Sequence, residues 1–485
     1  MGISTVSIPW AIWTILLPLA GSLLCFLLPR RAALLGQAAA FSIVVPVAGL
    51  GWQVATHGIQ RYAVGGWGAP LGIDLYADGL SSLMLIMTAL VGLGISLYAS
   101  AYFERRKAQF FWPLWLFLWA VLNALFLSGD IFNLYVTLEL LGLAAVALVA
   151  LAGGADALTG AMRYLLVSLL GSLCYLLGVA LLYHAFGTLD IISLGRLMMP
   201  MPAVWTAMGL MTAGLLLKTA LFPLHFWLPP AHASAPAPVS AILSALVVKA
   251  SFYLLLRLWL DLFPEPGAAP RLLLGVLGAG AILWGSLQAL RQKRLKLLVA
   301  YSTVAQLGYL FLAFPLLISA AWNAVVYFVL SHALAKSAMF LAVGNILYFG
   351  GHDRIDELDR IVQRLPLTMT AFAIAGISII GLPPSGGFVA KWLLLEAAFS
   401  SGQWGWVLVV ISGSLLAAAY VFKVIGFAFT QAKVLHETRA VPTIMEWTAL
   451  GLALAALALG LMAPLPLELM DIGAPWVTLI GEELP

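Results

Sequence analysis

The stretch from Leu217 to Lys249 decides the fold, and it begins Leu-Lys-Thr-Ala-Leu-Phe-Pro-Leu-His-Phe-Trp-Leu-Pro-Pro-Ala-His-Ala-Ser-Ala-Pro-Ala-Pro-Val-Ser. Two lysines, Lys218 and Lys249, lie in otherwise apolar segments, and a run interrupted by prolines separates them. A charged side chain in the hydrocarbon region costs at least about 2.5–3.5 kcal/mol and usually marks a functional site. We therefore interpret this stretch as part of an ion path and not as structural core.

Composition indicates that the whole chain is embedded in a membrane. Of its 485 residues, 63% are hydrophobic and only 9% are charged, and the mean hydropathy is +1.04. A soluble domain of this length needs more charge on its surface, so the sequence predicts a polytopic membrane protein. The net charge of +4 does not indicate nucleic-acid binding, because the basic residues are spread among short loops. The N-terminus lacks a basic region, so we expect a retained first span and not a cleaved signal peptide.

About 20 apolar residues cross a bilayer, and on that length the sequence predicts an all-α fold with about fourteen transmembrane helices. The expected spans are 9–28, 32–55, 78–102, 110–128, 131–152, 162–185, 204–228, 238–262, 271–290, 298–319, 322–348, 366–400, 404–430 and 444–468.

The lysines and arginines predict the orientation. Of the 24 basic residues, 15 fall in loops after odd-numbered spans and 4 in loops and helix ends on the other side. The first group is Arg30, Arg31, Arg105, Arg106, Lys107, Arg163, Arg291, Lys293, Arg294, Lys296, Arg354, Arg360, Arg364, Lys433 and Arg439, and the second is Arg61, Arg196, Arg257 and Arg271. The remaining five lie within spans: Lys218, Lys249, Lys336, Lys391 and Lys423. Because cytoplasmic loops carry the excess of basic residues, the odd-side loops are predicted to be cytoplasmic. Both termini are then expected on the opposite side of the cell inner (plasma) membrane.

Two spans are interrupted, and their spacing predicts an internal repeat. The seventh is broken at Phe222-Pro223-Leu224 and again at Leu228-Pro229-Pro230, and the twelfth at Gly381-Leu-Pro383-Pro-Ser-Gly-Gly387. The breaks lie five spans apart, and an odd shift inverts a repeat in the membrane. We expect an N-terminal three-helix segment (1–109), a first five-helix repeat acting as a proton half-channel (110–262), a second inverted repeat (271–430), and a C-terminal helix and tail (431–485).

Ionisable side chains deep in the spans are candidates for a proton relay: Glu139, Lys218, Lys249, His332, Lys336 and Lys391. His332 and Lys336 are four residues apart and therefore share one helix face. Buried lysines and histidines can load and release protons as neighbouring charges move. The broken turns would admit water, which is tolerated where the segment lines a cavity.

Other polar positions support more than one interpretation. They are predicted to serve proton uptake, proton release or the helix breaks: His225, His232, Pro223, Pro383, Glu396 and Lys423. Lys423 lies near the predicted cytoplasmic end, where a lysine can also extend its side chain to the interface. His225 and His232 can equally be interfacial histidines, and His332 a packing histidine. Asp130, just before the fifth span, is predicted to be a helix N-cap.

Other chemistries lack their signatures. The sequence contains no phosphate-binding loop, no dinucleotide fingerprint and no cysteine set for an iron–sulfur cluster. Cys25 and Cys174 are predicted to be packed or lipid-facing thiols. Haem would need paired histidines within the membrane, and only His332 is expected to be deep. We therefore expect no metal and no cofactor.

Several motifs identify a family resemblance. They are Leu217-Lys-Thr-Ala-Leu-Phe-Pro-Leu-His-Phe-Trp-Leu-Pro229, Pro238-Val-Ser-Ala-Ile-Leu-Ser-Ala245, Ala300-Tyr-Ser-Thr-Val-Ala-Gln-Leu-Gly-Tyr309, Ser331-His-Ala-Leu-Ala-Lys336 and Gly381-Leu-Pro-Pro-Ser-Gly-Gly-Phe388. Over nearly its whole length the chain resembles the antiporter-like subunits of respiratory complex I, energy-converting hydrogenases and Mrp-type multisubunit Na⁺/H⁺ antiporters. Gly65–Ile73, Asp78–Leu83 and Gly129–Tyr135 resemble the branch formed by the D subunits of the Mrp antiporters.

The resemblance implies roles at matching positions. Glu139 would be the fifth-helix carboxylate and Lys218 its partner, Lys249 a relay lysine, His332 and Lys336 the central connection, and Lys391 the terminal lysine. The implied function is proton translocation within a hetero-oligomeric Na⁺/H⁺ or K⁺/H⁺ antiporter, with other integral-membrane subunits as partners and no catalytic or redox centre in this chain. One alternative is a proton-pumping subunit of a complex I-like NADH–quinone oxidoreductase or a hydrogenase. A second alternative is a self-contained solute transporter.

Overall fold

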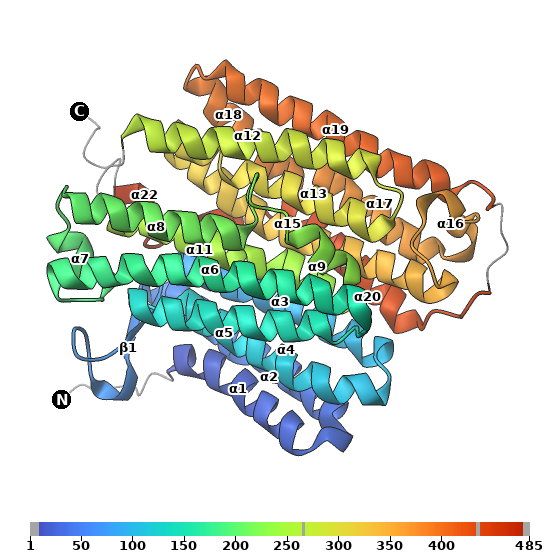
Figure 1. Ribbon diagram of the computed structural model, residues 1–485, viewed down its shortest axis with the longest axis horizontal. Coiled ribbons are helices and arrows are strands. Elements are labelled where there is room, and N and C mark those ends of the chain that lie inside the picture. Colours follow the sequence, from blue (N-terminus) through green and yellow to red (C-terminus); the bar gives the residue numbers. More distant parts are fainter. Residues whose placement is uncertain (1–8, 264–266, 433–436, 479–485) are drawn as a thin grey trace.

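The computed structural model describes residues 9–263, 267–432 and 437–478, and its long helices run along one common direction (Figure 1). An N-terminal segment precedes the repeats. It consists of α1 (Trp10–Leu27), η1 (Pro29–Arg31), α2 (Ala32–His57), β1 (Gln60–Ala63), η2 (Val64–Gly66), β2 (Asp74–Ala77) and α3 (Gly79–Tyr102). The antiparallel β1–β2 hairpin, which pairs Arg61 with Tyr76, departs from the predicted all-α fold. It occupies the long connection between the second and third spans.

The two halves that follow share an order of long helices, with three long helices, a broken helix and a closing helix in each. The first contains α4 (Arg105–Leu127), α5 (Ile131–Ala150), α6 (Gly154–Phe186), α7 (Ile191–Leu197), α8 (Pro202–Thr219), α9 (Leu228–Ser234), α10 (Ala237–Ile242), η3 (Leu243–Val247), α11 (Val248–Arg257) and η4 (Leu258–Leu262). The second contains α12 (Ala268–Arg291), α13 (Leu295–Leu310), α14 (Ala313–Leu316), α15 (Ser319–Gly350), η5 (Ile355–Glu357), α16 (Ile361–Arg364), α17 (Pro366–Ile380), α18 (Gly386–Ser400) and α19 (Trp404–Ala428). The chain ends in α20 (Thr443–Leu461), α21 (Pro464–Met470) and α22 (Pro475–Thr478).

Twelve helices within the described chain are long and apolar enough to cross a membrane. The broken helices α8–α9 and α17–α18 add the predicted seventh and twelfth spans. Helix edges differ from the prediction by up to eight residues, since α6 begins at Gly154 and not at 162. Arg163 therefore lies inside α6 and not in a loop, as its place in the charge count had assumed.

Two matching backbone bridges relate the halves. In each half, the start of the second long helix pairs with the segment that precedes the broken helix. The pairs are Ile131 N to Leu189 O (2.9 Å), Ile191 N to Gly129 O (2.9 Å), Leu295 N to Asp353 O (2.7 Å) and Ile355 N to Lys293 O (2.9 Å). All four positions recur at one constant separation along the sequence. Because five spans lie between the bridges, they sit at opposite ends of the molecule, as an inverted repeat requires.

Each helix break begins with a residue in the left-handed backbone conformation. Helix α8 stops at Thr219, and Ala220 follows with φ +58°. Helix α17 stops before Gly381 at φ +88°, and the Ser385 side chain caps α18 by accepting from Phe388 N. The second interruption predicted at Pro229-Pro230 is wrong, because these prolines occupy the first turn of α9. Proline is tolerated there, since the first N–H groups of a helix have no intrahelical partner.

The eighth and eleventh spans form the centre of the molecule. The continuous rod from α10 to η4 and the long helix α15 are both wholly buried over their membrane windows. Two π-turns, η3 and η4, interrupt the α-helical hydrogen bonding of the eighth span. The lysines that these two helices carry, Lys249 and Lys336, are therefore enclosed by protein.

Candidate functional site

Glu139 and Lys218 face each other through two serines of α6. Ser172 donates a hydrogen bond to the Glu139 carboxylate, and Ser168, one turn earlier, accepts from Lys218 Nζ at 2.8 Å. Lys218 Nζ also donates to the carbonyl of Leu138 at 3.3 Å. The ion pairs within 4.0 Å in the described chain do not include Glu139 with Lys218. The charges are thus separated by a pair of hydroxyl groups.

Glycines make room for the Lys218 side chain. A Cβ at Gly171 would lie 3.1 Å from Lys218 Cγ, and a Cβ at Gly142 would lie 2.4 Å from the Ser168 hydroxyl. Helices α6 and α8 therefore approach closely around the lysine.

The helix that carries Glu139 begins where it was predicted to begin. Asp130 caps α5 by accepting hydrogen bonds from Phe132 N and Asn133 N.

Lys249 is fully buried in the eighth span, directly after the π-turn η3. Its Nζ donates to the carbonyl of Ser244, which lies inside that π-turn. The Ser244 hydroxyl in turn lies 2.9 Å from Thr303 Oγ1 on α13. On the other side, Ser251 accepts from Thr219, the neighbour of Lys218, at 3.1 Å. Lys249 thus stands between the broken helix α8 and the second half.

Lys336 and His332 occupy the middle of α15. Lys336 Nζ donates to Val299 O at 3.0 Å and to the hydroxyl of Ser302. The same carbonyl of Val299 accepts from Thr303 at 3.0 Å, so a chain of polar atoms joins Lys249 to Lys336. The His332 ring stacks on Phe328 at 5.8 Å, and neither of its nitrogens finds a hydrogen-bond partner in the described chain.

Lys391 caps the C-terminal end of α17 by donating to its last carbonyl groups. Its Nζ donates to Ile379 O at 2.9 Å, to Ile380 O at 3.1 Å and to Ser414 Oγ at 3.2 Å. The ammonium group also lies 4.5 Å from the centre of the Tyr309 ring. Like Lys218, Lys249 and Lys336, it is held by neutral oxygens. The six predicted relay residues follow one another on α5, α8, α11, α15 and α18, and we call this set the row; polar contacts join its two central lysines, Lys249 and Lys336.

Four other candidates lie outside this row. Lys423 Nζ donates to Leu290 O and Gln292 O, both at 2.7 Å, and so anchors the C-terminal end of α12. Glu396 is exposed on α18. His225 lies beside the break at Pro223, and its ring stacks on Phe222 at 5.7 Å. Pro383 lies in the turn between α17 and α18.

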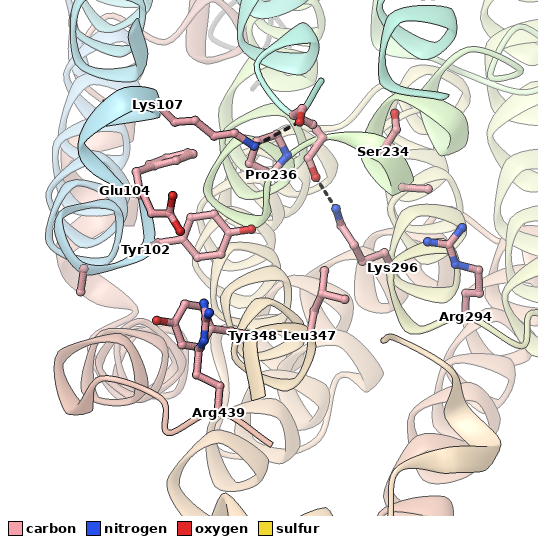
Figure 2. A pocket seen from close by; sticks show the side chains of 15 residues that line it. Tyr102, Glu104, Lys107, Ser234, Pro236, Arg294, Lys296, Leu347, Tyr348 and Arg439 are labelled. Atoms are coloured by element: carbon pink, nitrogen blue, oxygen red, sulfur yellow. Dashed lines mark hydrogen bonds between the residues drawn. The ribbon is translucent and has the colours of Figure 1, made fainter. Parts of the chain in front are cut away.

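Lys296 was missed by sequence reasoning, which placed it in a loop. It is buried in the first turn of α13, and its Nζ donates to Ala235 O. It lines a cavity of about 530 Å³, which we call the vestibule (Figure 2). Other side chains that Figure 2 shows around this space are Tyr102, Glu104, Lys107, Arg294, Tyr348 and Arg439. The apolar run Leu297-Leu-Val-Ala300 continues directly from this lysine and could have indicated its burial.

His232 lies deeper than predicted. It is fully buried against Phe340, with ring centres 5.2 Å apart, and neither ring nitrogen has a partner in the described chain. The charges that act on it most strongly are those of Lys296, Lys336 and Lys249. A buried polar group without a protein partner is commonly satisfied by water. The His232 ring is thus a buried polar group within electrostatic reach of the vestibule lysine and of two central lysines.

Known proteins share both the sequence motifs and the fold of this chain. Residues 128–417 match the family described as "NADH:quinone oxidoreductase/Mrp antiporter, TM". The chain belongs to this family. The resemblance predicted from the motifs is therefore confirmed, and the matched region contains both broken helices and all six residues predicted to form a relay.

Relatives from both branches of the family align with the chain. NADH-quinone oxidoreductase subunit N of Desulforudis audaxviator is 40% identical over 76% of this chain and 75% of its own length. The D subunit of the Na(+)/H(+) antiporter of Bacillus subtilis is 30% identical over 97% and 95%. A chain in the Mrp complex of Dietzia sp. has a TM-score of 0.90 at 26% identity, covering 99% and 98%. Respiratory complex I from Thermus thermophilus contains a chain with a TM-score of 0.77 at 28% identity, covering 94% and 98%.

Proposed function

We propose that this chain is the proton-translocating subunit of a multisubunit Na⁺/H⁺ or K⁺/H⁺ antiporter. The observation that carries the proposal is the set of four buried lysines, of which Lys249 and Lys336 are linked through hydroxyl and carbonyl groups. Alignment over almost the full chain with the D subunit of an antiporter and with a chain of an Mrp complex supports the choice of complex. Its partners would be other integral-membrane subunits in the lipid bilayer.

The proposed path begins at the Glu139–Lys218 pair. A proton reaching Lys218 is passed beside Thr219 and Ser251 to Lys249. From Lys249 it follows the hydroxyl groups of Ser244 and Thr303 toward Lys336, with water carrying it past the Ser244 and Val299 carbonyl groups, which only hold the two ammonium groups. His332, on the same face of α15, and then Lys391 would complete the row.

The surroundings of the lysines suit transfer. An ammonium group held only by neutral oxygens lacks the stabilisation that a carboxylate would give. A second positive charge arriving nearby therefore favours release of the first proton. At both helix breaks side chains donate to carbonyl groups of the preceding helix, Trp227 to Leu217 O and Lys391 to Ile379 O and Ile380 O. Such unwound turns are tolerated in a membrane where they line a water-filled cavity. In this proposal the lysines bind and release the protons, and hydroxyl groups and water molecules conduct the protons from one lysine to the next.

A second candidate is a proton-pumping subunit of a complex I-like oxidoreductase or a membrane-bound hydrogenase. The 40% identity to a subunit N favours it. In that case partner subunits would supply redox energy to the same relay. Co-purified small antiporter subunits would support the first candidate, and iron–sulfur subunits the second. Transport by this polypeptide reconstituted alone would instead indicate a self-contained transporter.

The proposed location is the cell inner (plasma) membrane, with repeats at 110–262 and 271–430. The described ends of the chain, in α1 and α22, lie at the same end of the molecule, which suits an even number of spans (Figure 1). Lys433, one of the basic residues in the charge count, lies outside the described residues. The vestibule would then face the cytoplasm, and both termini the other side.

The test is replacement of Glu139 or Lys218 by Ala in the assembled complex, with ΔpH-linked cation transport measured in membrane vesicles. We expect transport to fall by at least about tenfold, because each change interrupts the row at its start. The matched controls are Asp156→Ala and Lys293→Ala, which change exposed residues outside the row. Near-normal transport in both relay variants, with normal assembly, would contradict the relay.

A further inference from the structure

One helical rod connects two cavities at opposite ends of the molecule. The rod from α10 to η4 begins beside Pro236, which lines the vestibule, and ends at Asp261, which lines a second cavity of about 230 Å³. We call this second space the far cavity. Lys249 lies midway along the rod. A proton on Lys249 therefore has two ends of the same helix toward which it could leave.

The far half of the rod carries one polar stripe. Lys249, Tyr253, Arg257 and Asp261 recur every four residues and so lie on one helix face. Arg257 Nε donates to Tyr253 Oη at 3.1 Å, and one terminal nitrogen lies 3.4 Å from Asp261 Oδ2. This arginine stands between Lys249 and the far cavity, which it also lines. Sequence reasoning had placed it among the basic residues of loops and helix ends.

A buried carboxylate holds Arg257 in place. Its other terminal nitrogen donates to Asp78 Oδ1 at 2.6 Å, and the two side chains are 7% and 0% exposed. The rings of Tyr253 and Tyr76 lie 5.2 Å and 5.9 Å from the guanidinium carbon. The arginine therefore has partners on three sides and little freedom to move away.

Arginine blocks protons where lysine carries them. A guanidinium group keeps its charge in proteins, so it neither accepts nor releases a proton during transport. A fixed positive charge in a narrow, poorly hydrated passage also repels protons and other cations. At the vestibule end the corresponding cation is Lys296, whose Nζ donates to a backbone carbonyl. The cation at the vestibule end can therefore release its proton, whereas the cation at the far end cannot.

We propose that Arg257, locked by Asp78, is an electrostatic barrier that closes the first repeat toward the far cavity. A proton on Lys249 must then cross to Lys336 in the second repeat. The inference deepens the proposed function and rests on it. A purely structural ion pair, tying α3 to α11, would support assembly but would not change proton leakage. The two roles therefore predict different results.

Replacing Arg257 by a neutral residue would leave groups that can conduct protons from Lys249 to the far cavity. Without the arginine, Tyr253, Asp261 and Asp78 remain between Lys249 and the far cavity, and all three can exchange protons. Asp78 Oδ2 has no hydrogen-bond partner in the described chain, although Oδ1 caps α3 by accepting from Ser81 N. The Arg257→Gln variant should therefore leak protons across the first repeat.

The experiment uses vesicles that contain the whole complex, an imposed ΔpH, and no Na⁺ or K⁺ gradient. We expect ΔpH to decay about tenfold faster with Arg257→Gln than with the wild type, since the repelling charge is gone. Arg257→Lys keeps a positive charge but can release its proton, so it should also leak, at a rate between those of the wild type and Arg257→Gln. Adding Lys249→Ala to Arg257→Gln should abolish the leak, because it removes the donor behind the barrier.

The controls separate the barrier from folding and from the proposed function. If Arg257→Gln fails to accumulate, the double variant Asp78→Asn/Arg257→Gln removes both charges together and should leak in the same way. Wild-type decay in either assembled variant would overturn the barrier. Failure of the relay itself would show separately, as normal transport by Glu139→Ala.

Discussion

Lys218 Nζ donates a hydrogen bond to the hydroxyl of Ser168 over 2.8 Å, and this contact sets the distance between the lysine and its carboxylate. One turn along α6, Ser172 donates to Glu139. Two hydroxyl groups on one helix face therefore replace a direct ion pair. A direct pair would hold the proton on the lysine, whereas hydroxyl groups can reorient and pass protons between the two charges.

Removing the two hydroxyl groups should slow transport without unfolding the protein. We expect Ser168→Ala and Ser172→Ala each to reduce ΔpH-linked transport by about threefold to tenfold, corresponding to the ~0.5–1.5 kcal/mol of a typical hydrogen bond. Ser42→Ala is a suitable control, because Ser42 donates only to the carbonyl of Ala39 in its own helix. Transport equal to that of the control in both variants would show that the serines do not connect the charges.

The close approach of α6 and α8 gives a second prediction. A Cβ at Gly171 would lie 2.8 Å from Gly214 O and 3.1 Å from Lys218 Cγ, so Gly171→Ala must push the helices apart or displace the lysine. We expect a loss of about 1–3 kcal/mol in stability, as for other overpacked sites. Thermal unfolding of the purified complex measures it.

Gly209 on α8 is the matched control, because a Cβ there has no neighbour within 4 Å. Gly209→Ala should leave the unfolding midpoint unchanged or raise it slightly, since Ala favours helix over Gly by about 1 kcal/mol. Equal midpoints for the Gly171 and Gly209 variants would contradict the packing argument.

The sequence predicted those features of the fold and site that one residue type is enough to indicate. Prolines and glycines indicated both helix breaks, and lysines in apolar runs indicated the buried ammonium groups, because either signal is rare within a membrane helix. The inverted repeat followed from the spacing of the breaks. Asp130 behaved as an N-cap, since that role depends on neighbouring backbone N–H groups alone.

Features that depend on two helices were not predictable in this way. Ser168 and Ser172 look like ordinary small polar residues until α6 packs against α5 and α8. The π-turn η3, which brings Lys249 to the Ser244 carbonyl, leaves no mark in the hydrophobic pattern. Lys296 and Arg257 were assigned to loops or helix ends, because a single sequence does not tell a basic loop residue from one covered by another helix.

Lys296 gives a third prediction. Its ammonium group lines the vestibule and lies near the unpartnered ring of His232, so it is positioned to pass protons inward. We expect Lys296→Met to lower transport by about tenfold, because an apolar side chain of similar length removes the charge and the donor. Lys293→Met, at an exposed position three residues earlier, should transport like the wild type. If both variants transport equally, the vestibule lysine is not on the path.

The matching backbone bridges give the last prediction. Leu295 and Ile131 each occupy the first position of a helix, where proline fits the backbone but cannot donate a hydrogen bond. Leu295→Pro removes the bond to Asp353 O and brings the ring against that oxygen, which lies 2.7 Å from the nitrogen.

If the bridges are equivalent, Leu295→Pro and Ile131→Pro should destabilise the complex by similar amounts, about 1–3 kcal/mol each. Thr443→Pro, at the exposed first position of α20, should cost far less. Thermal unfolding of the three variants decides the matter. A loss confined to one half would mean that only one bridge supports its repeat, and the structural equivalence of the halves would then not extend to their stability.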